Sequence, residues 1–189
     1  MRRWPAVALM VLLLGGVMVA VGFLATRSAE ELIIGAIEPG VYHVPRSAVA
    51  LYLKHLASFD PNKPGERGLS LLRFTLNGYH DGGDTDTNRR CLDIADFLIK
   101  KGADVNAVGQ PGTPDAGLSA LHNAVLYESP DVVRFLLREG ANVNVRAGAG
   151  PFAGMTPLAF ASHLQTKTPR DPDKLGQVVE ILKNAGGVL

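Results

Sequence analysis

Hydrophobic and polar residues are arranged in two different patterns along this chain. Residues 4–26 carry no ionisable side chain, and residues 6–25 are apolar apart from glycine. After residue 45, apolar positions recur three and four residues apart, which is the spacing of one face of a helix. The patterns predict an apolar N-terminal helix followed by a series of short amphipathic helices.

The apolar stretch is long enough to cross a membrane, because a helix of about 20 residues rises about 30 Å, the thickness of the hydrocarbon core. Arg2 and Arg3 precede it, whereas the charges that follow it nearly balance. The positive-inside rule then predicts a cytoplasmic N-terminus and an exported remainder. We predict a signal anchor over residues 1–26. A cleaved signal peptide is one alternative, although the apolar region is longer than usual and shows no clear cleavage site. A helix buried in the protein core is the other alternative.

The exported part repeats itself. DIADFLIKKGADVNAV at residues 93–108 aligns with DVVRFLLREGANVNVR at residues 131–146, and VVEILKNAGG at residues 178–187 aligns with part of the second copy. A second similarity links GLSLL, GLSALHNAV and GMTPLAFAS, which begin at Gly68, Gly117 and Gly154. Each unit therefore has two halves, and both halves have helical spacing.

The second unit shows how its later half is delimited. Ser129 can cap a helix, Pro130 suits the first helical position and Asp131 suits the positive end of the helix dipole. Gly140 can adopt the left-handed conformation that ends a helix. A helix of about nine residues is marginal alone, so packing against neighbouring units must stabilise it.

These residues resemble the ankyrin repeat. In the central unit, GLSALHNAV from Gly117 stands where the family has Gly-x-Thr-Pro-Leu-His-x-Ala-Ala, and the family's Val-Val-x-x-Leu-Leu-x-x-Gly-Ala-x-Val-Asn follows. The third unit keeps Thr-Pro-Leu from Thr156 but has Ala159 where the family usually has His. The first unit keeps only Ser70 and Leu72 of the early half, together with the later half.

The resemblance implies an all-α fold, an ankyrin-repeat solenoid of helix-turn-helix units, which we expect to follow the N-terminal transmembrane helix. The expected parts are the signal anchor at residues 1–26, a stem at 27–44 and an ankyrin-repeat domain at 45–189. Within that domain we expect a capping half-repeat at 45–67 and repeats at about 68–108, 117–146 and 154–187. Insertions at residues 81–90, 109–116, 147–153 and 166–173 stretch the usual period, and such insertions form surface loops.

The resemblance also implies which residues bind a partner, since ankyrin arrays use their turn tips and the first helix of each unit. Tyr127, Phe152 and Met155 are the expected anchors, because large or adaptable side chains concentrate binding energy. Packing between repeats, or a loop folded back on itself, is the alternative role for these three. His122 is expected to hydrogen-bond backbone between repeats. The full set of expected partner-binding residues is Glu66, Arg67, Leu69, Asn77, Asp115, Ala116, Leu118, Tyr127, Phe152, Met155 and His163.

The function expected from these features is a non-enzymatic protein-binding module, tethered through residues 4–26 to a bacterial inner membrane and facing the periplasm. Its partner would be an envelope or periplasmic protein, which the module serves as an immunity or inhibitor protein or as a helper of a stress enzyme. A self-associating scaffold is one alternative. The other is an enzyme whose site lies in the insertions, with candidate residues His80, Asp81, Asp84, Asp86 and Cys91.

Composition removes several other classes of function. Nineteen Lys and Arg against 18 Asp and Glu give a net charge of +1, so no strong field would attract nucleic acid. The single cysteine, Cys91, cannot form an intramolecular disulfide or a cysteine-built zinc site, and we expect it to pack in the interior. The loop DGGDTDTN begins like a calcium loop, but Arg89 replaces its required glycine and Ala95 its closing glutamate. We expect no cofactor, no metal and no nucleic-acid partner.

Overall fold

The computed structural model divides the chain into two compact units, Met1–Ala57 and Ser58–Leu189. It describes residues 11–14, 17–20, 60–62, 70–79, 83, 85–110, 112, 117–167 and 169–189. The predicted stem at residues 27–44 lies outside the described residues, as does the predicted cap apart from residues 60–62.

In the N-terminal compact unit, Met1–Ala57, strands β1 (Val11–Leu14) and β2 (Val17–Ala20) pair antiparallel. The predicted N-terminal helix is therefore not shown at these residues, whereas the all-α prediction is confirmed for the repeats that follow. Both strands carry valine, and two glycines separate them in the sequence, which favours a tight hairpin. A uniformly apolar run lacks the periodicity that distinguishes helix from strand. Among the residues that the structure describes, no helix is both long and apolar enough to cross a bilayer.

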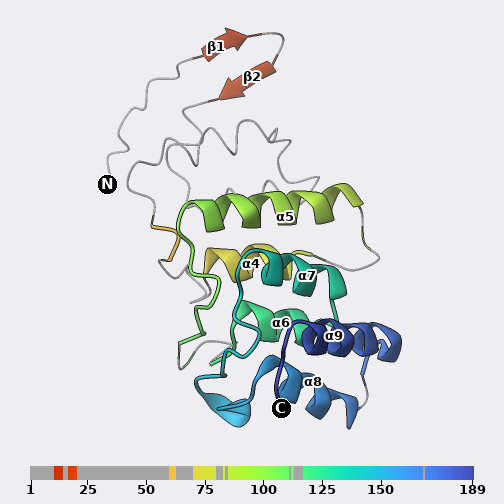
Figure 1. Ribbon diagram of the computed structural model, residues 1–189. Coiled ribbons are helices and arrows are strands. Elements are labelled where there is room, and N and C mark those ends of the chain that lie inside the picture. Colours follow the sequence, from red (N-terminus) through yellow and green to blue (C-terminus); the bar gives the residue numbers. More distant parts are fainter. Residues whose placement is uncertain are drawn as a thin grey trace, which may run out of the picture. The chain divides into compact units, whose positions relative to one another are not determined.

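The C-terminal compact unit, Ser58–Leu189, is a stack of helix pairs, each of which is one repeat unit. α4 packs on α5, α6 on α7 and α8 on α9, while α6 also contacts both α4 and α8, and α7 contacts α9 (Figure 1). This arrangement confirms the predicted helix-turn-helix units. The helices are α4 (Leu71–Asn77), α5 (Thr85–Lys100), α6 (Ala120–Leu126), α7 (Pro130–Arg138), α8 (Pro157–Gln165) and α9 (Pro172–Asn184), with a 3-10 turn η1 (Gly150–Phe152) before α8.

The first helix of each pair begins at an equivalent hydroxyl residue. The side chains of Ser70, Ser119 and Thr156 accept a hydrogen bond from the backbone N–H three residues later, at 3.3, 3.3 and 3.1 Å. Each bond satisfies one of the N–H groups that a helix start leaves without an intrahelical acceptor. The repeated Gly-x-Ser/Thr motif is therefore a set of helix starts.

The predicted bounds of α7 are confirmed. Pro130 is the first residue of the helix, and Gly140, with φ +88°, follows its end. Ser129 holds the cap conformation without a side-chain cap bond. Its hydroxyl instead donates to the carbonyl of Tyr127 at 3.4 Å.

The insertion at residues 81–90 is a helix over much of its length and not the predicted solvated loop, because α5 begins at Thr85. Asp86 forms ion pairs with Arg89 and Arg90, at the three- and four-residue spacings that support a helix. The hydrogen bond from Arg89, assisted by Arg90, holds the pKa of Asp86 below its usual value. Asp86 therefore already has two cationic partners on its own helix.

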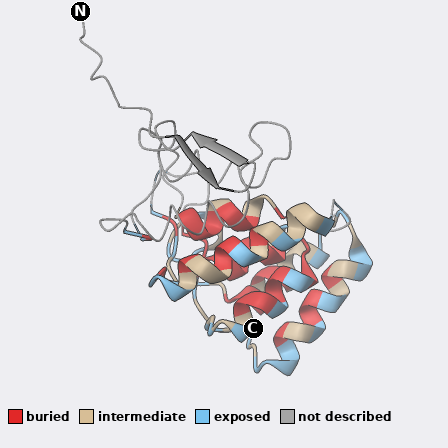
Figure 2. Cartoon of the chain, turned by 90° about the horizontal axis from the view of Figure 1, so that it is seen from above, coloured by how far each residue is buried: buried red, intermediate tan, exposed pale blue. Residues whose placement is uncertain are grey.

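The interior of the stack is formed by the facing sides of the helices, whose outer sides are exposed (Figure 2). Leu121, Phe135 and Leu158 are at most 3% exposed, as the packed-stack hypothesis requires. Phe97 is only half-buried, with the Lys101 ammonium 5.7 Å from its ring centre. The largest fully buried aliphatic side chains are Leu72, Leu98, Leu121, Leu136, Leu175 and Leu182.

Asparagine side chains join each unit to the next one. Asn62, Asn106 and Asn144 each accept a backbone N–H from the following unit, at 2.7, 2.7 and 2.9 Å. The amides of Asn62 and Asn144 also donate to a glycine carbonyl of that unit, at 2.9 and 3.1 Å. Residues 60–62 thus make the same contact as the ends of the later units.

Candidate functional site

His122 bridges two repeats, as the resemblance implies. Its Nε2 donates to the carbonyl of Met155 at 3.1 Å, and its Nδ1 lies 2.8 Å from the hydroxyl of Ser119. The ring is fully buried. Its role is therefore to hold the start of α6 against the loop that precedes α8.

Arg73 occupies the equivalent position in the first unit, where the sequence showed no histidine. Its guanidinium Nη1 donates to the carbonyl of Leu118 at 2.5 Å, and Leu118 corresponds to Met155 in the next unit. Arg73 is only 3% exposed. Arg73 therefore donates to a backbone carbonyl of the next repeat, which is the contact that His122 makes at the following junction between repeats.

Replacing Arg73 with alanine is expected to lower the free energy of unfolding by about 2–4 kcal/mol, because the change removes a charge-assisted bond and leaves a void. Arg73→His should recover part of that loss, since histidine makes this bond in the next unit. Urea denaturation followed by circular dichroism measures both variants. If Arg73→His is no more stable than Arg73→Ala, the equivalence of the two junctions is refuted.

The stability of the stack should also depend on the protonation of His122. Burial lowers its pKa from 6.5, outweighing the hydrogen bond to Met155, so the folded form binds the proton less readily than the unfolded chain. The contribution of His122 to the free energy of unfolding is then fully present above about pH 6.5. It is lost as the pH falls below that value, and the free energy of unfolding changes by at most about 1.4 kcal/mol per pH unit. Urea denaturation between about pH 5 and 8 should show this slope in the wild type and a flatter profile in His122→Gln. Identical pH profiles for the wild type and His122→Gln would contradict the assignment of this slope to His122.

Leu118 was expected to bind a partner, but its side chain is only 7% exposed and is therefore not available. Its carbonyl accepts bonds from Arg73 and from the N–H of Gly109, which hold it between two loops. Met155 is half-buried, and its carbonyl is occupied by His122 and by the N–H of Ala147. The family pattern places both residues on the loops but does not show which way their side chains point.

Phe152 lies in the insertion at residues 147–153 and packs back onto α8. Its ring is 4.8 Å from the ring of Phe160, edge to face, and 5.7 Å from that of His163. Phe152 and His163 both remain half-exposed. Phe152 therefore packs on the helix that follows its own loop and not between repeats, while part of its surface still faces solvent.

Tyr127 is the most exposed of the three expected anchors, at 42%. It caps the end of α6, on the turn that leads to α7. Asn77 holds a similar position at the end of α4 and is half-buried. The remaining predicted partner-binding residues, Glu66, Arg67, Leu69, Asp115 and Ala116, lie outside the described residues.

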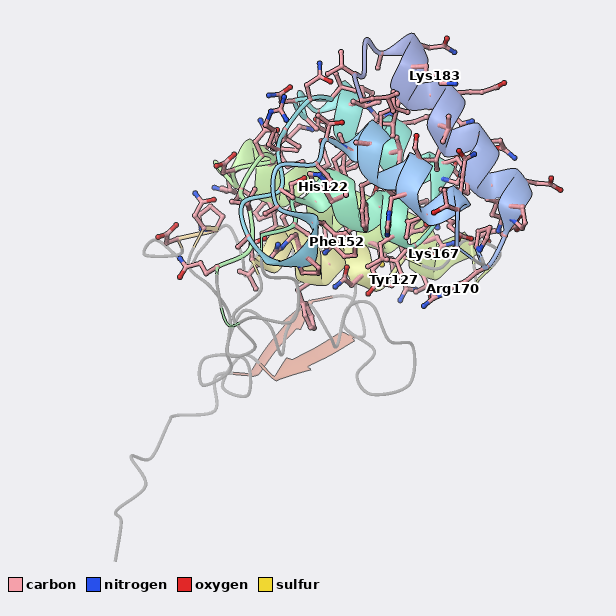
Figure 3. The ribbon with its side chains drawn as sticks, turned by 90° about the horizontal axis from the view of Figure 1, so that it is seen from below. His122, Tyr127, Phe152, Lys167, Arg170 and Lys183 are labelled. Atoms are coloured by element: carbon pink, nitrogen blue, oxygen red, sulfur yellow. The ribbon has the colours of Figure 1, made fainter. Side chains whose placement is uncertain are left out.

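Tyr127 belongs to a cleft that the sequence did not predict. The cleft has a volume of about 210 Å³ and is formed by the turns that join the two helices of each pair. We call it the turn-side cleft. Figure 3 shows Tyr127 and Arg170 at this edge of the stack. Its lining residues are Tyr79, Tyr127, Glu128, Ser129, Arg170, Asp171 and Lys174.

Glu128 fixes one wall of the turn-side cleft. Its carboxylate accepts the backbone N–H groups of Arg170 and Asp171, at 2.9 and 2.5 Å. Glu128 is 5% exposed, and its φ of +52° is unusual for a residue with a side chain. Asp171 in turn caps α9 through the N–H of Lys174, at 3.1 Å. The loop before α9 is thus tied to the turn of the preceding unit.

The residues suggested for an enzyme site do not assemble where they are described. Asp86 is paired with arginines at the surface, whereas Cys91 is completely buried, and burial raises the pKa of its thiol to about 11. His80, Asp81 and Asp84 lie outside the described residues. In the described part of the chain, no group of three or more His, Cys, Asp or Glu residues is placed to hold a metal ion.

Comparison with known proteins identifies the repeats. Residues 87–168 match the family model described as ankyrin repeats (3 copies). The chain also resembles the crystal structure of the ankyrin repeat domain of Bcl-3, a member of the IkappaB protein family, with a TM-score of 0.55 and 24% identity. The match covers 75% of this chain and 51% of the Bcl-3 chain, so this chain spans about half the length of that relative. Residues 87–168 are therefore similar to ankyrin repeats, and the stack of helix pairs has the ankyrin-repeat fold.

Proposed function

We propose that the repeat stack is a non-enzymatic module that binds another protein. The observation that carries the proposal is a rigid framework: paired helices joined across repeats by Arg73, His122 and the asparagine amides. Such a framework displays the insertion at residues 147–153 and the described residues 169–171 in fixed positions. A binding surface that is already ordered loses little entropy when a partner docks.

The partner-binding residues that remain in this proposal are those with exposed or half-exposed side chains. Tyr127 offers the largest exposed aromatic surface, and Phe152 contributes the free part of its ring. Asn77, Met155 and His163 complete the described set. Glu66, Arg67, Leu69, Asp115 and Ala116 stay predictions from the sequence.

A capture experiment in native membranes tests the proposal. The full chain, tagged after Leu189 and extracted in mild detergent, should retain one protein in a fixed ratio. Tyr127→Ala and Phe152→Ala should each lower the amount captured by about tenfold while the melting temperature stays near that of the wild type. Gln177→Ala, an exposed change on α9, is the control and should capture the partner normally. Equal capture by all variants would refute the assigned surface.

We further propose that residues 4–26 tether the stack to a bacterial inner membrane, with the repeats in the periplasm. The support is composition, since this segment carries no ionisable side chain. An open two-stranded hairpin would leave backbone groups without partners in lipid, so the segment must become helical there. Alkaline phosphatase fused after Leu189 should be active, and a tag before Arg2 should stay on the membrane-bound chain. An inactive fusion would refute the orientation, and loss of the tag would favour signal cleavage.

The proposed partner is an envelope or periplasmic protein, bound by an immunity or inhibitor protein or by a helper of a stress enzyme. The identity of the captured protein distinguishes these roles: a toxin favours the first and an oxidative-stress enzyme the second. Light scattering of the purified chain tests the alternative of a self-associating scaffold. A monomer would count against that alternative.

A further inference from the structure

We propose that the turn-side cleft binds a carboxylate side chain of an acidic segment on the partner protein, and that Arg170 is the residue that holds it. The inference rests on the proposed function in assuming a protein partner. It places that contact at the helix-helix turns, away from the loops that precede the first helix of each pair.

The acidic groups of the turn-side cleft are already engaged within the chain. Both oxygens of Glu128 accept backbone N–H groups, of Arg170 and Asp171. One oxygen of Asp171 accepts the N–H of Lys174, and the other lies 3.8 Å from the ammonium of the same residue. Next to the cleft, Asp131 accepts the hydroxyl of Tyr79 at 3.1 Å.

The guanidinium of Arg170 is in the opposite situation. Within the described residues, its backbone N–H is bound, but its side chain makes no hydrogen bond or ion pair. Arg170 is exposed and lines the cleft. The cleft therefore offers a set of unused donors beside acceptors that are satisfied, and an anionic acceptor is the ligand that complements it.

A carboxylate matches this site in shape and in charge. A guanidinium presents parallel N–H groups that bind both oxygens of one carboxylate. The cleft, at about 210 Å³, holds a side chain rather than a single water molecule, and Tyr127 adds an exposed ring to its wall. The nearby carboxylates of Glu128 and Asp171 would repel a doubly charged phosphate more strongly than a singly charged carboxylate.

Glu128 makes Arg170 ready to bind. It holds the backbone of Arg170 through a partly buried hydrogen bond of 2.9 Å, and its own φ of +52° lies in the left-handed region. Fixing that backbone before the ligand arrives lowers the entropy cost of binding. Glu128 is therefore a positioning residue for the cleft.

The test uses a fluorescein-labelled peptide of six glutamates as the probe, with six glutamines as its neutral control. Fluorescence anisotropy at low ionic strength measures binding to the full chain in non-ionic detergent micelles. Arg170→Gln should raise the Kd of the glutamate peptide by about tenfold or more, because it removes a charge-assisted contact. Lys183→Gln, the matched control, removes one exposed positive charge at the far end of α9 and should leave the Kd within about twofold (Figure 3).

Several outcomes would overturn the inference. Equal weakening by Arg170→Gln and Lys183→Gln would show a general attraction between charges. Equal binding of the glutamate and glutamine peptides would show that charge is irrelevant. A phosphoserine peptide that binds more tightly, and loses its affinity in Arg170→Gln, would make phosphate the ligand.

The partner-capture experiment separates this inference from the proposed function. If Arg170→Gln captures the partner normally while Phe152→Ala does not, the role of the cleft is refuted and the binding function stands. If no variant and no wild-type chain captures any protein, the proposed function fails, whatever the peptide result.

Discussion

Replacing Gly117 with alanine is expected to lower the free energy of unfolding by at least about 3 kcal/mol. Gly117 has a φ of +76°, and an added Cβ would lie 2.2 Å from the backbone nitrogen of Ala149. The loop cannot easily move away, because Gly117 donates to the carbonyl of Gly109 at 2.8 Å and accepts the N–H of Gly148 at 2.7 Å. The cost combines a left-handed backbone with an overlap against main-chain atoms. Urea denaturation measures the loss.

Gly140→Ala is the matched control for this prediction. Gly140 also has a positive φ, +88°, but no heavy atom lies within 4 Å of the added Cβ. Only the backbone cost applies, so the expected loss is about 1–2 kcal/mol. A similar loss for both variants would mean that the contact between the two loops is unimportant.

Phe160→Ala is expected to cost about 3–5 kcal/mol, the usual loss when a fully buried phenylalanine is truncated. Phe160 is completely buried and supports Phe152 across 4.8 Å. The change should therefore also release the insertion at residues 147–153. Thermal denaturation measures the stability, and limited proteolysis reports cleavage within the insertion.

Phe97→Ala makes the same chemical change at a half-buried position and should cost clearly less than Phe160→Ala. It should also leave proteolysis of the 147–153 insertion unchanged. Rapid cleavage of that insertion in both variants would refute its specific dependence on Phe160.

The repeats could be predicted from the sequence because their signals are local. Pro130 and Gly140 delimit α7 within about ten residues, and the hydroxyls of Ser119 and Thr156 mark the starts of α6 and α8. Leu121 and Leu158 repeat in register, so their common burial also followed. Each of these features depends on neighbours along the chain and on periodicity.

Features that depend on neighbours in space were missed. The Gly-x-Ser motifs align Arg73 with His122, but the side chains differ, and only the carbonyls that they bind show that they make the same contact. The turn-side cleft draws on turns of three different units, so no short motif marks it. The burial of Leu118 was likewise hidden from the family pattern.

The helical insertion at α5 was missed for a different reason, because its signal was present but outweighed. Asp86 stands three and four residues before Arg89 and Arg90, which supports a helix. The surrounding Gly, Asp, Thr and Asn residues favour a loop. In the structure the helix begins at Thr85, and both ion pairs form on it.

The asparagine amides determine how disorder would spread through the stack. Each of Asn62, Asn106 and Asn144 spans one junction, so the loss of one amide weakens the coupling to one neighbour and leaves the next junction intact. Opening would then propagate pair by pair, as in a one-dimensional lattice with nearest-neighbour coupling. The pair α6 and α7, which has a neighbour on both sides, would be the slowest to exchange its amide protons with solvent.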